Sequence, residues 1–184
     1  MNLKKIIIYI VLVIVLVGVG FMAYLMLTTR SHSPADRMEF SDGDFQLSID
    51  YCRPFKKDRL IFGDESENAL LVYGKYWRTG ANEATEIEFN KPVSINGQNV
   101  VSGRYRLYTI PDKTEWTVAL NSEIGKWGYG EPDYDLDVLV TKVPASQSSS
   151  IVEQFTITGS LTGDNSMEIV LSWDKTEVKI PVKY

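Results

Sequence analysis

The chain begins with a long apolar run and then changes to an alternation of apolar and polar residues. From Ile6 to Leu27 there is no charged residue, and most positions are Ile, Val or Leu. About 22 helical residues at 1.5 Å each reach roughly 33 Å, which is enough to cross a hydrocarbon core of about 30 Å. The sequence therefore predicts one N-terminal transmembrane helix over residues 6–27.

The flanks of this segment predict an uncleaved, single-pass anchor. A secretory signal has a shorter apolar region, about 7–15 residues, followed by a small-residue cleavage site, and no clear site of that kind follows here. Lys4 and Lys5 precede the helix, which favours a cytoplasmic N-terminus. We expect a cytoplasmic tail over residues 1–5, a linker over residues 28–38 and an extracytoplasmic domain over residues 39–184.

Beyond the linker, apolar residues recur at every second position, as in half-buried β-strands. Phe45, Leu47 and Ile49 share one parity, whereas Gln46 and Ser48 take the other. Further segments of this kind contain Ile87 and Phe89, Val93 and Ile95, Tyr105 to Thr109, Trp116 to Leu120, Val138 and Val140, Phe155 and Ile157, Met167 to Trp173, and Val178 to Val182. The pattern predicts an all-β domain of about ten strands.

Turn residues separate these segments. Asn96-Gly97 is typical of a two-residue hairpin, and Pro111-Asp112 and Thr162 to Asn165 are further turn sequences. Many short strands joined in this way predict two packed sheets, that is, a β-sandwich, for which a jelly-roll is one arrangement. The polar stretch from Ser146 to Ser150 is interpreted as a solvated loop.

Composition excludes several classes of function. His32 is the only histidine and Cys52 the only cysteine, so histidine-dependent nucleophilic catalysis, the common zinc sites and an internal disulfide have no basis in the sequence. The residues after Arg30 carry 16 cations and 24 carboxylates, and such a surface repels nucleic acid. No glycine-rich phosphate loop precedes a helix, and we expect no cofactor and no bound metal.

Several sequence motifs follow one another along residues 39–184. The longest is YGKYWRTGANEAT at residues 73–85, and the others are YCRP (51–54), RLIFG (59–63), GRYRLYTIP (103–111), EWTV (115–118), WG (127–128), DVL (137–139) and LSW (171–173). Together they resemble the bacterial family catalogued as domain of unknown function 2911. This resemblance implies no activity, because the family has none assigned. Similar sequences usually have Ser in place of Cys52, which implies a structural position for this residue.

The turn after Trp77 provides the first candidate ligand-binding site. Arg78, Asn82 and Glu83 supply a fork of donors, an amide and a carboxylate, which suit hydroxyls, carboxylates or a peptide backbone. The alternative is that these groups bind one another and make a rigid corner. Arg53 and Arg59 add positive charge to the same site if the first strand lies beside this turn; otherwise their stems cover apolar surface.

A glycine-containing stretch from Gly125 to Asp135 provides further candidates. Trp127 and Tyr134, with Tyr129 between them, suit stacking on a sugar ring, but aromatic residues also close the open end of a β core. The acidic residues from Glu131 to Asp137 invite a calcium-binding interpretation, but Val138 stands where an EF-hand loop needs glycine.

These observations favour a non-catalytic, membrane-anchored module that binds a polar small molecule, a glycan, a peptide or an envelope protein. The first alternative is a hydrolase of envelope carbohydrate or peptide, with Glu83 or Glu86 as the acid or base. The second is a structural subunit of an envelope assembly. The sequence itself leaves the ligand, the strand order and the oligomeric state open.

Overall fold

The computed structural model describes residues 2–184, which form a helical unit ending at His32 and a β domain from Ser33 to Tyr184. Helix α1 runs from Leu3 to His32 and is long and apolar enough to cross a membrane. Its large apolar side chains between Ile7 and Leu25 are 41–70% exposed, so the chain itself does not cover them. A helix suits an apolar solvent because its backbone groups bond to one another.

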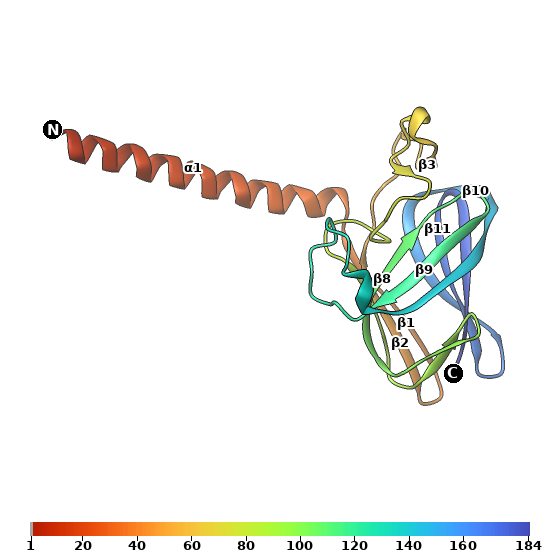
Figure 1. Ribbon diagram of the computed structural model, residues 1–184. Helices are drawn as coiled ribbons and strands as arrows, with labels where there is room; N and C mark the ends of the chain where they lie inside the picture. Colours follow the sequence, from red (N-terminus) through yellow and green to blue (C-terminus); the bar gives the residue numbers. More distant parts are fainter. Residues whose placement is uncertain (1) are drawn as a thin grey trace. The chain divides into compact units, whose positions relative to one another are not determined.

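The β domain is built around one nine-stranded antiparallel sheet with the strand order β1-β2-β5-β8-β9-β10-β11-β6-β7 (Figure 1). Its strands are β1 (Ala35–Asp42), β2 (Phe45–Cys52), β5 (Thr85–Phe89), β6 (Val93–Ile95), β7 (Gln98–Val100), β8 (Gly103–Ile110), β9 (Glu115–Asn121), β10 (Asp137–Gly163) and β11 (Ser166–Lys183). A separate parallel pair, β3 (Phe62–Gly63) and β4 (Leu71–Val72), flanks the short helix η1 (Glu65–Glu67). The domain is all-β, as predicted.

Strand β10 connects the two halves of this nine-stranded sheet, which pack on each other as the two layers of a sandwich. Residues from Asp137 to Pro144 pair with β9, and residues from Ala145 to Gly163 pair with β11. Side chains of the two layers meet in the core: the Tyr51 ring of β2 contacts the Phe155 ring of β10 edge-on, with centroids 5.7 Å apart. Aromatic residues in both layers bury large apolar areas, which stabilises the packing of one layer on the other.

The predicted alternation is confirmed in most strands. In β2, Phe45, Leu47 and Ile49 are buried, whereas Gln46 is exposed. The Asn96-Gly97 hairpin is also present, since Val93 of β6 pairs with Val100 of β7.

Two predictions about β10 were wrong. Val138 and Val140 are 46% and 50% exposed, whereas Leu139 and Val143 are buried, so the opposite parity faces the core. The stretch from Ser146 to Ser150 lies within β10 and not in a loop, and the pairing with β11 shifts its register between Gln147 and Val152. A shift of this kind is a bulge, which lets a polar stretch continue an otherwise regular strand.

The expected linker over residues 28–38 differs from the observed elements. Helix α1 continues to His32, and the Thr28 hydroxyl donates to the Tyr24 carbonyl at 2.8 Å. Strand β1 begins at Ala35 and pairs with β2 over its whole length. Only Ser33 and Pro34 therefore separate the helix from the first strand.

Candidate functional site

Residues 122–136, which join β9 to β10 and include the short helix η2 (Tyr134–Leu136), form the candidate site; we call them the aromatic loop. Its backbone is fixed to the turn that follows Trp77. The Ala84 amide donates to the Lys126 carbonyl at 3.1 Å, and the Gly128 amide donates to the Asn82 carbonyl at 3.0 Å. Pairing of the kind found between strands therefore fixes this part of the loop backbone against residues 82–84.

A buried arginine lies beneath the aromatic loop. Arg106 of β8 is only 1% exposed, and its guanidinium donates to the Tyr76 hydroxyl and to the Gly130 carbonyl and pairs with the Glu123 carboxylate at 3.3 Å. The Tyr76 hydroxyl in turn donates to the Gly128 carbonyl at 3.1 Å. A buried charge is tolerated when such partners surround it, so Arg106 fixes the loop from below.

The C-terminal end of the loop is held by acidic side chains. Asp137 accepts hydrogen bonds from the Tyr108 hydroxyl at 2.6 Å and from the Asn121 amide at 2.7 Å. Burial, and then the bond to this carboxylate, raises the pKa of Tyr108 above its ordinary value. Glu131 accepts from Tyr134. Within residues 2–184, no group of three or more His, Cys, Asp and Glu residues is placed to hold a metal ion.

The exposed aromatic side chains of the β domain all belong to the aromatic loop. Trp127, Tyr129 and Tyr134 are 55%, 81% and 45% exposed, whereas the other three tryptophans are at most 4% exposed. The Arg78 guanidinium lies 5.8 Å from the centroid of the Tyr129 ring, and burial lowers the pKa of this arginine. Aromatic rings that gather on one exposed loop are typical of binding sites.

The structure brings three of the predicted site residues together with Trp127. Arg78 donates to the Asn82 carbonyl at 3.2 Å. Asn82 is 5% exposed, has a positive φ of 59°, and donates from its side chain to the Ser33 carbonyl at 3.2 Å. Glu83 pairs through its backbone with Trp127, and its carboxylate accepts from the Cys52 thiol at 3.4 Å. Asn82 is thus a buried residue that supports the turn, and its side chain is not on the surface where a ligand would bind.

The two other predicted arginines bind carbonyl groups of the domain. Arg53 donates to the Phe155 carbonyl at 3.0 Å and pairs with Asp36 at 3.1 Å, so it joins β10 to β1. Arg59 donates to the carbonyls of Lys56 and Phe55, within its own loop. Arg53 follows Cys52 and therefore lies near the Glu83 corner, whereas Arg59 stabilises a different segment.

Glu86, the second acid named for a hydrolase, is also engaged in the framework. Its side chain is 12% exposed and lies within hydrogen-bonding distance of the Arg104 guanidinium. Its other oxygen accepts from the Gly125 amide at 2.6 Å. The carboxylate therefore joins β5 to β8 and to the aromatic loop.

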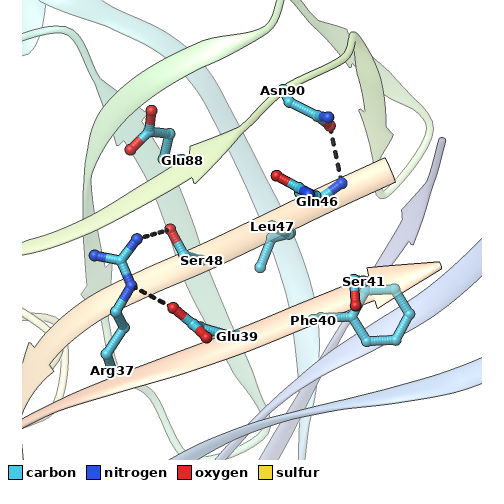
Figure 2. A pocket seen from close by; sticks show the side chains of 9 residues that line it. All are labelled: Arg37, Glu39, Phe40, Ser41, Gln46, Leu47, Ser48, Glu88 and Asn90. Carbon is cyan, nitrogen blue, oxygen red and sulfur yellow. Dashed lines mark hydrogen bonds and ion pairs between the residues drawn. The ribbon is translucent and has the colours of Figure 1, made fainter. Parts of the chain in front are cut away.

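A pocket of about 410 Å³ lies over β1, β2 and β5, apart from the aromatic loop. Figure 2 shows that several of its polar groups bind one another: Arg37 binds Glu39 at 3.0 Å and Ser48 at 2.9 Å, and Asn90 accepts from the Gln46 backbone at 2.9 Å. Most of these groups bind one another, and the aromatic residue of the lining, Phe40, is half-buried. The pocket is therefore a weaker candidate than the aromatic loop.

Residues 33–182 match the family described as protein of unknown function (DUF2911). The chain belongs to this family. The DUF2911 match covers the β domain, including the aromatic loop, and confirms the resemblance inferred from the motifs. Comparison with curated proteins and with solved structures gave no match. Because the DUF2911 description assigns no ligand or reaction, function has to be argued from the site.

Sequence reasoning missed Arg106, which this DUF2911 member uses to hold its aromatic loop. Arg106 stands between two apolar residues of β8, a position that is normally solvent-exposed in an alternating strand. The motif around it, GRYRLYTIP, contains two arginines of the same parity. The side chain of Arg104 is 34% exposed, and that of Arg106 is 1% exposed, and nothing in the motif distinguishes them.

Proposed function

We propose that the chain is a membrane-anchored, extracytoplasmic β-sandwich module that binds a polar ligand of saccharide-like chemistry at the aromatic loop. Helix α1 supports the anchor, and Lys4 and Lys5 before it favour a cytoplasmic N-terminus. The β domain then lies outside the cytoplasm.

One observation carries the assignment of the site. Trp127 and Tyr129 expose their rings to solvent, although the backbone between Lys126 and Gly128 is hydrogen-bonded to the Asn82 turn. A loop whose backbone is already ordered loses less freedom when a ligand stacks on its rings than a disordered loop would. The apolar face of a sugar ring suits such stacking.

Polar groups around these rings suit the hydroxyls of the same ligand. The Lys126 ammonium is 57% exposed, and Glu131 and Asp133 are exposed on the aromatic loop. Ammonium groups donate and carboxylates accept hydrogen bonds, so together they can bind a hydroxyl group both as an acceptor and as a donor. The ligand class that combines apolar faces with many hydroxyls is a saccharide.

The test is a titration of the full chain in mild detergent with neutral tetrasaccharides of glucose, mannose and N-acetylglucosamine. The heat of binding, measured by isothermal titration calorimetry, provides the signal in every variant; in the unaltered chain the fluorescence of Trp127, the one exposed tryptophan in the described residues, provides a second signal. Trp127→Ala and Tyr129→Ala should each weaken binding by about tenfold or more, corresponding to about 1.4 kcal/mol, and leave the thermal midpoint unchanged.

Val101→Ala is the matched control, since Val101 is 70% exposed and lies on a different segment. It should leave the affinity unchanged. The proposal is lost if none of the tetrasaccharides binds, or if the two aromatic variants bind as well as the control does.

A further inference from the structure

The aromatic loop lies close to the residue at which the β domain joins α1. The Ser33 carbonyl accepts from the Asn82 side chain at 3.2 Å, and the Asn82 carbonyl accepts from the Gly128 amide at 3.0 Å. Two hydrogen bonds therefore connect Ser33 to the backbone of the loop. Ser33 is bonded covalently to His32, the last residue of α1. The covalent link alone keeps the loop near the end of the helix.

The length of α1 determines how far Ser33 lies from the hydrocarbon of a membrane. If residues 6–27 span the hydrocarbon, five helical residues, Thr28 to His32, extend beyond it. They add about 7.5 Å, and the headgroup layer on each side of a bilayer is roughly 5–8 Å thick. Ser33 then lies at the outer boundary of the headgroups, within reach of the adjacent loop.

The side chains of the loop have the properties of residues found at that depth. Trp and Tyr are enriched at the membrane interface, where the ring is partly desolvated and the polar tip stays wet. Trp127 and Tyr129 are exposed, and Ile124, which is 45% exposed, adds apolar surface. The opposite end of the domain has no such ring in the described residues: its exposed large apolar side chains include Val101 and Leu161.

The charges of the loop restrict the kind of headgroup. Residues 122–136 contain four carboxylates and one lysine, Lys126. Anionic lipids attract clusters of Lys and Arg, so an acidic loop of this kind disfavours them. An uncharged or zwitterionic headgroup has no such conflict, and its hydroxyl or ammonium groups can bind the carboxylates.

We infer that the aromatic loop rests in the headgroup layer of the bilayer that holds α1, so that its ligand is the uncharged or zwitterionic headgroup of a membrane lipid. The inference goes beyond the proposed function: it concerns the same loop, but it does not depend on saccharide binding. The β domain then binds the surface of the membrane that anchors it.

The experiment places the full chain in phosphatidylcholine vesicles and measures tryptophan fluorescence. Subtracting the spectrum of Trp127→Phe from that of the unaltered chain isolates Trp127, because the other three tryptophans are buried. Bromine atoms on the lipid acyl chains near the headgroup should quench this difference emission by roughly half, and aqueous iodide should quench it weakly, as for an interfacial indole.

The matched control introduces an indole at the opposite end of the domain. Val101→Trp, in the Trp127→Phe background, suits this purpose: Val101 is beside Tyr184, whose ring stacks at 3.9 Å on Phe45 at the start of β2. Cys52, beside the loop, is at the other end of this eight-residue strand, about 23 Å away at 3.3 Å per residue. The new indole should be quenched by iodide and not by bromine.

If this variant does not fold, Leu161→Trp takes its place, beside the β10–β11 turn. In Figure 1 that turn and the teal aromatic loop lie far apart on the β domain.

The outcomes separate this inference from the proposed function. Bromine quenching confined to Trp127 supports it, whether or not tetrasaccharides bind in detergent. Iodide quenching of Trp127 equal to that of the control, without bromine quenching, overturns it; saccharide binding in that case leaves the proposed function standing. If neither bromine quenching of Trp127 nor saccharide binding is observed, both proposals are overturned. A loop attracted by charge would respond to added phosphatidylglycerol and to salt, and that response would overturn the assignment to uncharged or zwitterionic headgroups.

Discussion

Replacing Arg106 with methionine tests whether the buried guanidinium holds the aromatic loop in place. The arginine is 1% exposed and donates to the Tyr76 hydroxyl, the Gly130 carbonyl and the Glu123 carboxylate. Methionine is flexible and apolar and can replace the packing of the arginine stem. The substitution therefore removes the charge and the donors and leaves three acceptors without this partner.

We expect the free energy of unfolding to fall by about 2–4 kcal/mol. Removing one partner of a buried ion pair costs about 3–5 kcal/mol. Here the Glu123 side chain is 26% exposed and keeps Lys126 at 3.5 Å. In addition, Arg106 Nε is buried without a hydrogen-bond partner within residues 2–184, so the native arginine is itself incompletely satisfied. Both features lower the cost of the substitution.

The assay is urea unfolding of the full chain in mild detergent, followed by the fluorescence of the buried tryptophans. The midpoint should shift and the slope should stay the same if only stability changes. Arg37→Met is the control: this arginine of β1 is 47% exposed and pairs with exposed carboxylates, so its loss should cost about 1 kcal/mol or less. Proteolysis within residues 122–136 should accelerate in Arg106→Met alone. Equal losses of stability in the two variants would refute the role assigned to Arg106.

Three further predictions concern the corner, the strand faces and the response to pH. Asn82→Ala should cost about 1–3 kcal/mol, because its φ of 59° strains alanine and its side-chain hydrogen bond is lost; Asn82→Gly should cost less in the same urea titration. Leu139→Ala should cost about 2–5 kcal/mol and Val140→Ala less than about 0.5 kcal/mol, and the reverse order would contradict the faces assigned to β10. Burial, and then a hydrogen bond to Asp42, raises the pKa of Tyr184 to about 12. Its contribution to stability is therefore complete below about pH 10, where the unfolded tyrosine is still protonated, and decreases as pH rises toward about 12. Tyr184→Phe should reduce the slope of the urea midpoint against pH over this interval.

The alternation of apolar and polar residues located most strands, but it was insufficient where both parities are apolar. In β10, Val138 and Val140 compete with Leu139 and Val143 for the core. The choice between them is made by packing against strands that are distant in sequence, because a one-residue slip moves every side chain to the other face. Strand β1 was missed in part for a related reason: its only large apolar residues are Met38 and Phe40.

The sequence identified the types of residue in the candidate site, but it could not show which of them lie close together in the fold. Arg78, Asn82 and Glu83 stand in one turn, and Trp127 stands in another, so their proximity depends on a backbone pairing that periodicity cannot reveal. The burial of Arg106 depends on the same pairing, since the loop between β9 and β10 covers this part of β8.

The continuity of β10 has a consequence for how the domain comes apart. Its first part is hydrogen-bonded to β9 and its second part to β11, and the change of partner falls between Pro144 and Ala145. If the two layers separated, β10 would lose its hydrogen bonds either to β9 or to β11. The tryptophans packed between the layers would then be exposed to water. We therefore expect one cooperative melting step for the whole β domain, with no stable half-folded species.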